Sequence, residues 1–174
     1  MGFFTVLALC TLSVANGFEA PPFEEDPRFA WWQDVKAMTS IRERMYIVSR
    51  NYNITTRNRC HSAVKTAALR HDTIVVALRT HLGGVDGPPQ EFKSVFTTSR
   101  TGTHRRDNAV IYKLHPRCQL LMTESAVDYP IPKLCMLLYH NYCPGPKVLL
   151  YQPDCKIQDA FLAHKASAGR QIQY

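Results

Sequence analysis

This 174-residue sequence lacks the features that mark membrane proteins and the commonest enzymes and zinc proteins. Beyond the N-terminus, no stretch is apolar over the ~18 residues that a membrane-spanning helix needs, which excludes a multi-pass protein. The motifs Gly-x-Ser-x-Gly, His-Glu-x-x-His and Cys-x-x-Cys are absent, so we expect neither a catalytic site nor a metal or other cofactor. Charged residues make up only 20% and hydrophobic residues 45%, a balance that excludes a disordered chain.

Acidic residues are few, since 14 Asp and Glu stand against 21 Lys and Arg, giving a net charge of +7. Such a balance predicts attraction to polyanions or acidic partners. The most basic segment is Arg100–Arg106, which is either a solubilising turn or a loop that binds a sulfated glycan or an acidic host protein. A nucleic acid is not an expected partner, because basic and aromatic residues do not alternate there.

The N-terminus reads as a secretory signal peptide. Residues 1–17 carry no charged side chain and contain a short apolar run that ends in small residues. We expect cleavage between Ala15 and Phe18. The remaining residues, 18–174, have the length of a single domain, with a core over 31–155 and a polar tail over 156–174. The mature protein is then secreted, with no attachment to a membrane.

Secretion makes disulfides the expected state of the cysteines. Cleavage would remove Cys10 and leave five cysteines, at positions 60, 118, 135, 143 and 155. Two bridges and one spare thiol allow 15 pairings, between which spacing alone does not choose. Asn53 begins the glycosylation motif Asn-Ile-Thr. Cys143 follows His140 by three residues, yet a nucleophilic Cys–His pair is disfavoured in an oxidising compartment, so no enzyme is expected.

Alternation of apolar and polar residues predicts a mainly β fold. Several runs rich in β-branched and aromatic residues are separated by short turns, which favours an antiparallel barrel or sandwich. A short helix over 31–38 comes before these runs, and a second helix over 133–142 follows them. The expected strands are 45–52, 59–69, 72–82, 91–99, 108–114, 118–123 and 147–152.

In order, these features resemble the tick salivary lipocalins, the histamine-binding protein family. The resemblance covers about 31–155 and includes the helix AWWQDVKAM, the first strand MYIVSRNY, Cys60 in the second strand and Cys118 in a late strand. It ends in the block IPKLCMLLYHNYCPGPKVLLYQPDC. The resemblance implies a lipocalin-like antiparallel β-barrel with a helix packed on it. It also implies the bridges Cys60–Cys155 and Cys118–Cys135, with Cys143 unpaired.

What the resemblance implies for function is a secreted salivary protein that binds and sequesters a small host mediator. Such mediators are a biogenic amine, histamine or serotonin, or a leukotriene-like lipid. Sequestration would suppress host inflammatory or haemostatic defence. The strand count is one or two short of a closed eight-stranded barrel, so an exposed sheet edge could also favour a weak dimer over a monomer.

One departure from the family bears on the ligand. Amine-binding members carry Asp after the late-strand cysteine and a Glu-Leu-Trp/Tyr motif, whereas Gln119 follows Cys118 here. The departure favours an anionic lipid, which cations such as Arg44, Arg50 and Arg79 would bind. For an amine, the remaining carboxylates are those of residues Asp34, Asp72 and Glu124.

The candidate ligand-binding residues are mostly aromatic, since lipocalin-like cups have apolar linings. An alternative function is a protein-binding antagonist of host defence, acting through the outer barrel surface and the basic loop. A closed apolar cavity would support the first function, and a filled core with an exposed patch the second. The candidates are Trp32, Tyr46, Val48, Phe92, Phe96, Tyr112 and Arg79.

Overall fold

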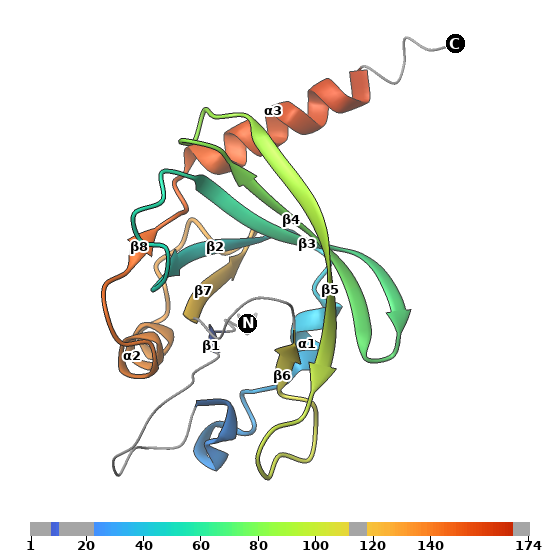
Figure 1. Cartoon of the computed structure of the whole chain (residues 1–174), viewed down its shortest axis with the longest axis vertical. Coiled ribbons are helices and arrows are strands. Elements are labelled where there is room, and N and C mark those ends of the chain that lie inside the picture. Colours follow the sequence, from blue (N-terminus) through green and yellow to red (C-terminus); the bar gives the residue numbers. More distant parts are fainter. Residues whose placement is uncertain (1–7, 11–22, 112–117, 169–174) are drawn as a thin grey trace.

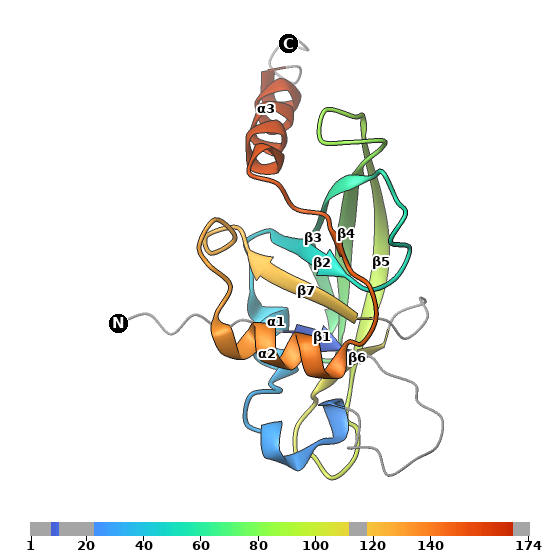
Figure 2. The same ribbon diagram turned by 90° about the vertical axis from the view of Figure 1, so that its left-hand side faces the viewer.

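The strands form one antiparallel sheet in a computed structural model of the chain, which describes residues 8–10, 23–111 and 118–168. The sheet has eight strands in the order β1-β7-β2-β3-β4-β5-β6, and β8 pairs with β2. Figures 1 and 2 show the sheet curling into a half-barrel around a concave face. Within the described residues, β1 and β6 end this order and do not pair with each other. The strands are β1 Ala8–Cys10, β2 Met45–Arg50, β3 Arg59–Arg70, β4 Thr73–His81, β5 Pro89–Ser99, β6 Ala109–Ile111, β7 Cys118–Thr123 and β8 Val148–Leu149.

Helices lie around this sheet. Two short 3-10 turns, Phe23–Glu25 and Pro27–Phe29, come before helix α1, Val35–Ser40. Helix α2, Lys133–Tyr142, packs outside the sheet against β1, and Figure 2 shows it in front of β1 and below β7. Helix α3, Asp154–Ala168, projects past the ends of β3 and β4 (Figure 1).

The predicted fold class is confirmed: the chain is mainly β, with an antiparallel sheet, a short N-terminal helix and a helix packed on the sheet. Strand β7 and helix α2 have the predicted bounds. Helix α1 begins at Val35 and not at Trp31, because the Asp34 carboxylate caps it by accepting hydrogen bonds from the amides of Lys36 and Ala37 at 2.9 and 3.2 Å. Part of the expected strand 108–114 lies outside the described residues.

The C-terminal segment differs from expectation. The polar tail predicted after residue 155 is helical over most of its length, since α3 continues to Ala168. Among its side chains over 154–164, only those of Cys155 and Asp159 are buried. A helix that buries so little apolar surface has no amphipathic pattern by which sequence reasoning recognises it.

A β-bulge in β2 decides which side chains face the concave side. Ile47 pairs with Leu121, but the next pair along the strand joins Ser49 to Leu120, so Val48 is an extra residue. Simple alternation would put Tyr46, Val48 and Arg50 on one face. The bulge instead turns Arg50 to the concave face, while Tyr46 and Val48 stay in the core on the opposite face.

Two disulfides hold the helices to the sheet. The structure contains the Cys60–Cys155 bridge that the resemblance implies, and this bridge ties the first turn of α3 to β3. Cys60 has a left-handed backbone with φ of 55°, which is costly for a residue with a side chain, and its amide donates to the Leu150 carbonyl at 2.9 Å. The bridge and this hydrogen bond hold the strained residue in place.

The second bridge corrects the expected pairing. Cys118 is bonded to Cys143, not to Cys135, which stands outside both bridges. The chain leaves the end of β7, turns back and returns through α2, so the C-terminal end of the helix lies beside the start of the strand. Cys135 is eight positions earlier, about 12 Å along the helix axis, and out of reach of Cys118.

Candidate ligand-binding cavity

A cavity of about 270 Å³ lies on the concave face of the sheet. Its volume is close to the lower end of the roughly 300–1,000 Å³ typical of small-molecule sites. Helix α1 and strands β2 to β7 all contribute to its wall. The lining residues are Met38, Thr39, Ile41, Met45, Ile47, Arg50, Tyr52, His61, Ser62, Ala63, Lys65, Ile74, Val76, Leu78, Arg79, Thr80, Phe92, Phe96, Val110, Gln119 and Leu121.

Most of the wall is aliphatic or aromatic. Alternate residues of β4, Ile74, Val76 and Leu78, point into the cavity from one strand, as the period of two predicts. Phe92 and Phe96 extend this surface onto β5. Phe92 remains 53% exposed, which places it where the cavity opens to solvent. The site is therefore suited to a ligand with an apolar body.

Arg50 brings a buried positive charge to this apolar wall. Its side chain is only 5% exposed, and its Nε has no hydrogen-bond partner. Its other contacts are one long hydrogen bond and one aromatic ring: Nη2 is 3.5 Å from the Asn53 carbonyl, and the guanidinium carbon lies 4.7 Å from the centre of the Tyr52 ring. No ion pair joins Arg50 to a carboxylate in the described residues. A buried cation with unmet hydrogen-bonding capacity is costly, unless a ligand supplies the missing acceptor.

Neutral polar groups accompany Arg50. His61 Nε2 lies 3.1 Å from the Thr80 hydroxyl, and the Gln119 amide donates to the Tyr52 hydroxyl. Burial, followed by the charges of Arg50 and Arg59, lowers the pKa of His61 from 6.5 to about 4, so its ring is neutral at physiological pH. Arg50 is thus the permanent charge of this polar group.

The other two cations of the wall already have partners. The Lys65 ammonium donates to the Thr39 carbonyl at 2.8 Å. Arg79 donates to Glu91 at 3.0 Å and to Asp159 at 2.8 Å. No Asp or Glu is among the described lining residues. The cavity therefore presents an uncompensated positive charge and no anionic group that would bind an amine.

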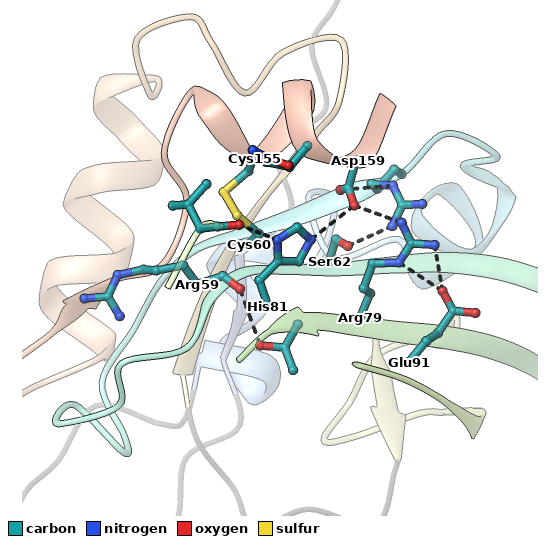
Figure 3. A network of polar contacts seen from close by, with 12 residues as sticks. Arg59, Cys60, Ser62, Arg79, His81, Glu91, Cys155 and Asp159 are labelled. Carbon is teal, nitrogen blue, oxygen red and sulfur yellow. Dashed lines mark hydrogen bonds and ion pairs between the residues drawn. A yellow bond between two sulfur atoms is a disulfide. The ribbon is translucent and has the colours of Figure 1, made fainter. Parts of the chain in front are cut away.

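Outside the cavity, a buried carboxylate fastens α3 to the sheet (Figure 3). Asp159 accepts hydrogen bonds from Tyr46 and from Arg79, both at 2.8 Å. Arg44 Nε and His81 Nε2 lie 3.7 and 3.6 Å from its oxygens. Desolvation and the hydrogen bond to this carboxylate raise the pKa of Tyr46 far above its usual value, which keeps the hydroxyl as a donor.

The structure brings together three of the predicted ligand-binding residues: Phe92, Phe96 and Arg79 line the cavity. Two do not line it: Tyr46 and Val48 alternate with the cavity-lining Met45 and Ile47 and so lie in the core on the opposite face. Trp32 is another correction: it lies in the turn before α1, is 40% exposed and packs against Trp31. Tyr112 lies outside the described residues.

Most of the charged residues considered for binding the ligand lie outside the cavity. Of Arg44 and Arg50, only Arg50 lines the cavity, since Arg44 is directed to Ser62 and Asp159. None of the three carboxylates considered for an amine is in the lining. Asp34 caps α1, Asp72 accepts from Thr73, and Glu124 follows the end of β7.

Sequence reasoning missed His61, Gln119 and Tyr52 as site residues. The pairing of β2 with β7 places Gln119 opposite Arg50, and only knowledge of that pairing would have shown it. His61 follows the strained Cys60, and the pairing of β3 is irregular between Arg59 and Ser62. Alternation along β3 therefore does not predict which face of the sheet the His61 side chain lies on.

Three other features were looked for in the described residues: a Cys–His pair, a metal site and a membrane-spanning helix. Cys143 is disulfide-bonded and has no thiol for a Cys–His pair. Among the residues that the structure describes, no three metal-binding side chains come together. The described helices are all too short or too polar to cross a membrane.

Comparison with solved structures finds a likeness in fold. No protein-family model and no curated protein matches this chain. Among solved structures, Japanin from Rhipicephalus appendiculatus bound to cholesterol superposes with a TM-score of 0.44 and 12% identity. The superposition covers 64% of this chain and 95% of that one. A likeness of this size identifies neither a family nor a ligand for this chain.

Proposed function

We propose that this protein is a secreted, lipocalin-like binding protein that sequesters a small host mediator with an apolar body and an anionic group. The observation that carries the proposal is Arg50, a buried guanidinium in an apolar cavity, with no carboxylate partner among the described residues. A ligand carboxylate beside it would satisfy Nε and neutralise the charge.

The chain's own chemistry favours a lipid over an amine. An amine cation would need carboxylates or an electron-rich cage, whereas the described wall holds cations and no acid. A fatty-acid derivative such as a leukotriene-like lipid would lay its chain along the β4 and β5 side chains. The resemblance to tick salivary lipocalins supports saliva as the setting, and two disulfides suit an oxidising compartment.

Native mass spectrometry of the secreted protein tests the proposal. We expect a one-to-one adduct with arachidonate or leukotriene B4, and none with histamine or serotonin at the same concentration. Arg50→Gln should weaken lipid binding at least tenfold, because about 1.5–3 kcal/mol is lost with a charged hydrogen bond. Arg57→Gln removes the same charge from an exposed position and should bind as the parent does. Amine adducts without lipid adducts, or full lipid binding by Arg50→Gln, would overturn the proposal.

The protonation of His61 reports where the anionic group sits. An anion beside Arg50 favours the imidazolium form, so saturation with arachidonate should raise the pKa of His61 from about 4. NMR titration of the imidazole with and without lipid measures this shift. An unchanged pKa in a saturated sample would place the carboxylate away from Arg50.

The alternative, a protein-binding antagonist of host defence, has one surface in its favour. Helix α2 exposes Leu134, Met136 and Leu137 by 38, 46 and 56%. Such a function would survive Arg50→Gln and fail on replacement of these three side chains by serine, which separates the two proposals.

A further inference from the structure

A second pocket, which shares no lining residue with the cavity, lies beside the start of α1. Its volume is about 490 Å³, and it lies between the turn that precedes α1 and the loop that joins β5 to β6. The lining residues are Pro27, Ala30, Trp31, Gln33, Asp34, Thr103, His104, Arg105, Arg106 and Asn108.

The frame of this pocket is rigidly joined. The backbone carbonyl of Glu24 accepts hydrogen bonds from the Thr101 hydroxyl at 2.8 Å and the Asn108 amide at 2.5 Å, and lies 2.7 Å from His104 Nε2. Gln33 donates to the Phe23 carbonyl within the segment before α1, and the Asn108 amide lies 3.5 Å from the Gln33 side-chain oxygen, a second link between the two segments. These polar contacts hold in place the basic loop that the sequence presents only as a turn or a binding loop.

On this frame, an aromatic ring and two cations face solvent. Trp31 is 75% exposed, and its ring centroid lies 4.3 Å from that of Trp32. Arg105 and Arg106 are exposed and form no ion pair within the described residues. The nearby Asp34 carboxylate is occupied in capping α1. A largely exposed Trp is unusual for so apolar a side chain, and exposed apolar surface beside a pocket marks interaction sites.

From this geometry we infer a second binding site, for a sulfated sugar of the glycosaminoglycan type. The face of a pyranose ring carries apolar C–H groups with slight positive charge, which pack on the electron-rich face of an indole. The paired guanidinium groups suit sulfate, which accepts two parallel hydrogen bonds from each. The pocket's volume fits a sugar unit better than a bare anion, and the net charge of +7 assists approach of a polyanion.

Binding of a fully sulfated heparin tetrasaccharide, followed by calorimetry at several salt concentrations, tests this site. Arg105→Gln/Arg106→Gln should weaken binding at least tenfold and flatten the dependence of log K on log salt by about two counterions. Trp31→Ala should weaken binding at least fivefold with the salt dependence unchanged, because it removes an uncharged contact. Arg42→Gln/Arg57→Gln removes two exposed charges elsewhere and should bind nearly as the parent does.

Three results would overturn the inference. Equal losses in the two double variants would show general attraction to a basic protein. Full binding by Trp31→Ala would exclude ring stacking at this pocket. Equally tight, Trp31-dependent binding of oligo-dT would assign the pocket to nucleic acid. All variants should still bind arachidonate, so the outcome is independent of the lipid proposal.

Discussion

The hydroxyl of Tyr46 donates a 2.8 Å hydrogen bond to the carboxylate of Asp159 and so joins β2 to α3 across 113 residues of sequence. Arg79 donates to the same carboxylate, whose side chain is 4% exposed. Meanwhile α3 turns Ile157 and Phe161 to solvent, at 66 and 64% exposure. Helix α3 is therefore held to the sheet mainly by a buried carboxylate and a disulfide, and less by apolar packing.

Replacing Asp159 by Ala should lower the free energy of unfolding by about 3–5 kcal/mol, the usual loss when one partner of a buried ionic network is removed. Urea denaturation measures it. Asp154→Asn, in the exposed first turn of the same helix, is the matched control and should change stability by less than about 1 kcal/mol. A loss in Asp159→Ala as small as that of the control would show that this network does not hold α3.

The second disulfide predicts that Cys143 contributes more to stability than Cys135. Cys143→Ala should cost about 3 kcal/mol of stability by opening a loop between residues 25 apart. Cys135→Ala should cost about 1 kcal/mol, as an ordinary substitution does. Burial raises the pKa of the Cys135 thiol, so iodoacetamide should modify it only after denaturation. Chymotrypsin, which cuts between the two positions, should release Cys118 linked to Cys143; a Cys118–Cys135 peptide would contradict the structure.

Stability should depend on pH through His61. Its folded pKa is about 4, below the 6.5 of the unfolded chain. Between these values only the unfolded state binds the proton, so the free energy of unfolding rises with pH across this window and levels off above it. For one proton the slope is at most about 1.4 kcal/mol per pH unit. His61→Gln should reduce the slope, and the exposed His71→Gln should leave it unchanged; equal slopes in both variants would assign the effect elsewhere.

Replacing Phe92 by Ala should weaken ligand binding without lowering stability much. It lies in the cavity wall but is 53% exposed, so Phe92→Ala should change the free energy of unfolding by less than about 1 kcal/mol. Arachidonate binding should nevertheless weaken severalfold, because apolar contact with the lipid chain is lost. Val95→Ala is the control: it is similarly exposed, at 52%, and is not a lining residue. Equal binding by the two variants would place the lipid elsewhere.

Local signals made much of the fold predictable. Helix α2 has its predicted bounds because prolines at 132 and 144 flank a segment without Gly or Pro. Strand β4 could be predicted because Ile74, Val76 and Leu78 recur at every second position, as in a strand with one apolar face. Helix α3 escaped prediction, since its attachment depends on Asp159 and Cys155, whose partners lie on distant strands.

The site was harder to predict than the fold, for a geometric reason. Period-two alternation groups Arg50 with Tyr46 and Val48, and one extra residue in β2 is enough to turn Arg50 into the cavity while the other two stay in the core. Pairing across strands, which places Gln119 opposite Arg50, is likewise invisible in a single sequence. Which cysteine bonds to Cys118 depends on the direction in which α2 returns.

The bulge in β2 also makes the strand's length adjustable. Because Val48 has no opposite residue on β7, a chain lacking it would restore regular pairing while Ile47 and Arg50 kept their cavity-facing positions. Loss of a single codon at this point would therefore straighten the strand and keep the cation in the cavity. Loss of the Ser49 codon would have the same effect, because Val48 would then stand opposite Leu120 and Arg50 would stay opposite Gln119. Removal of either residue is therefore a change in the length of β2 that keeps Arg50 facing the cavity.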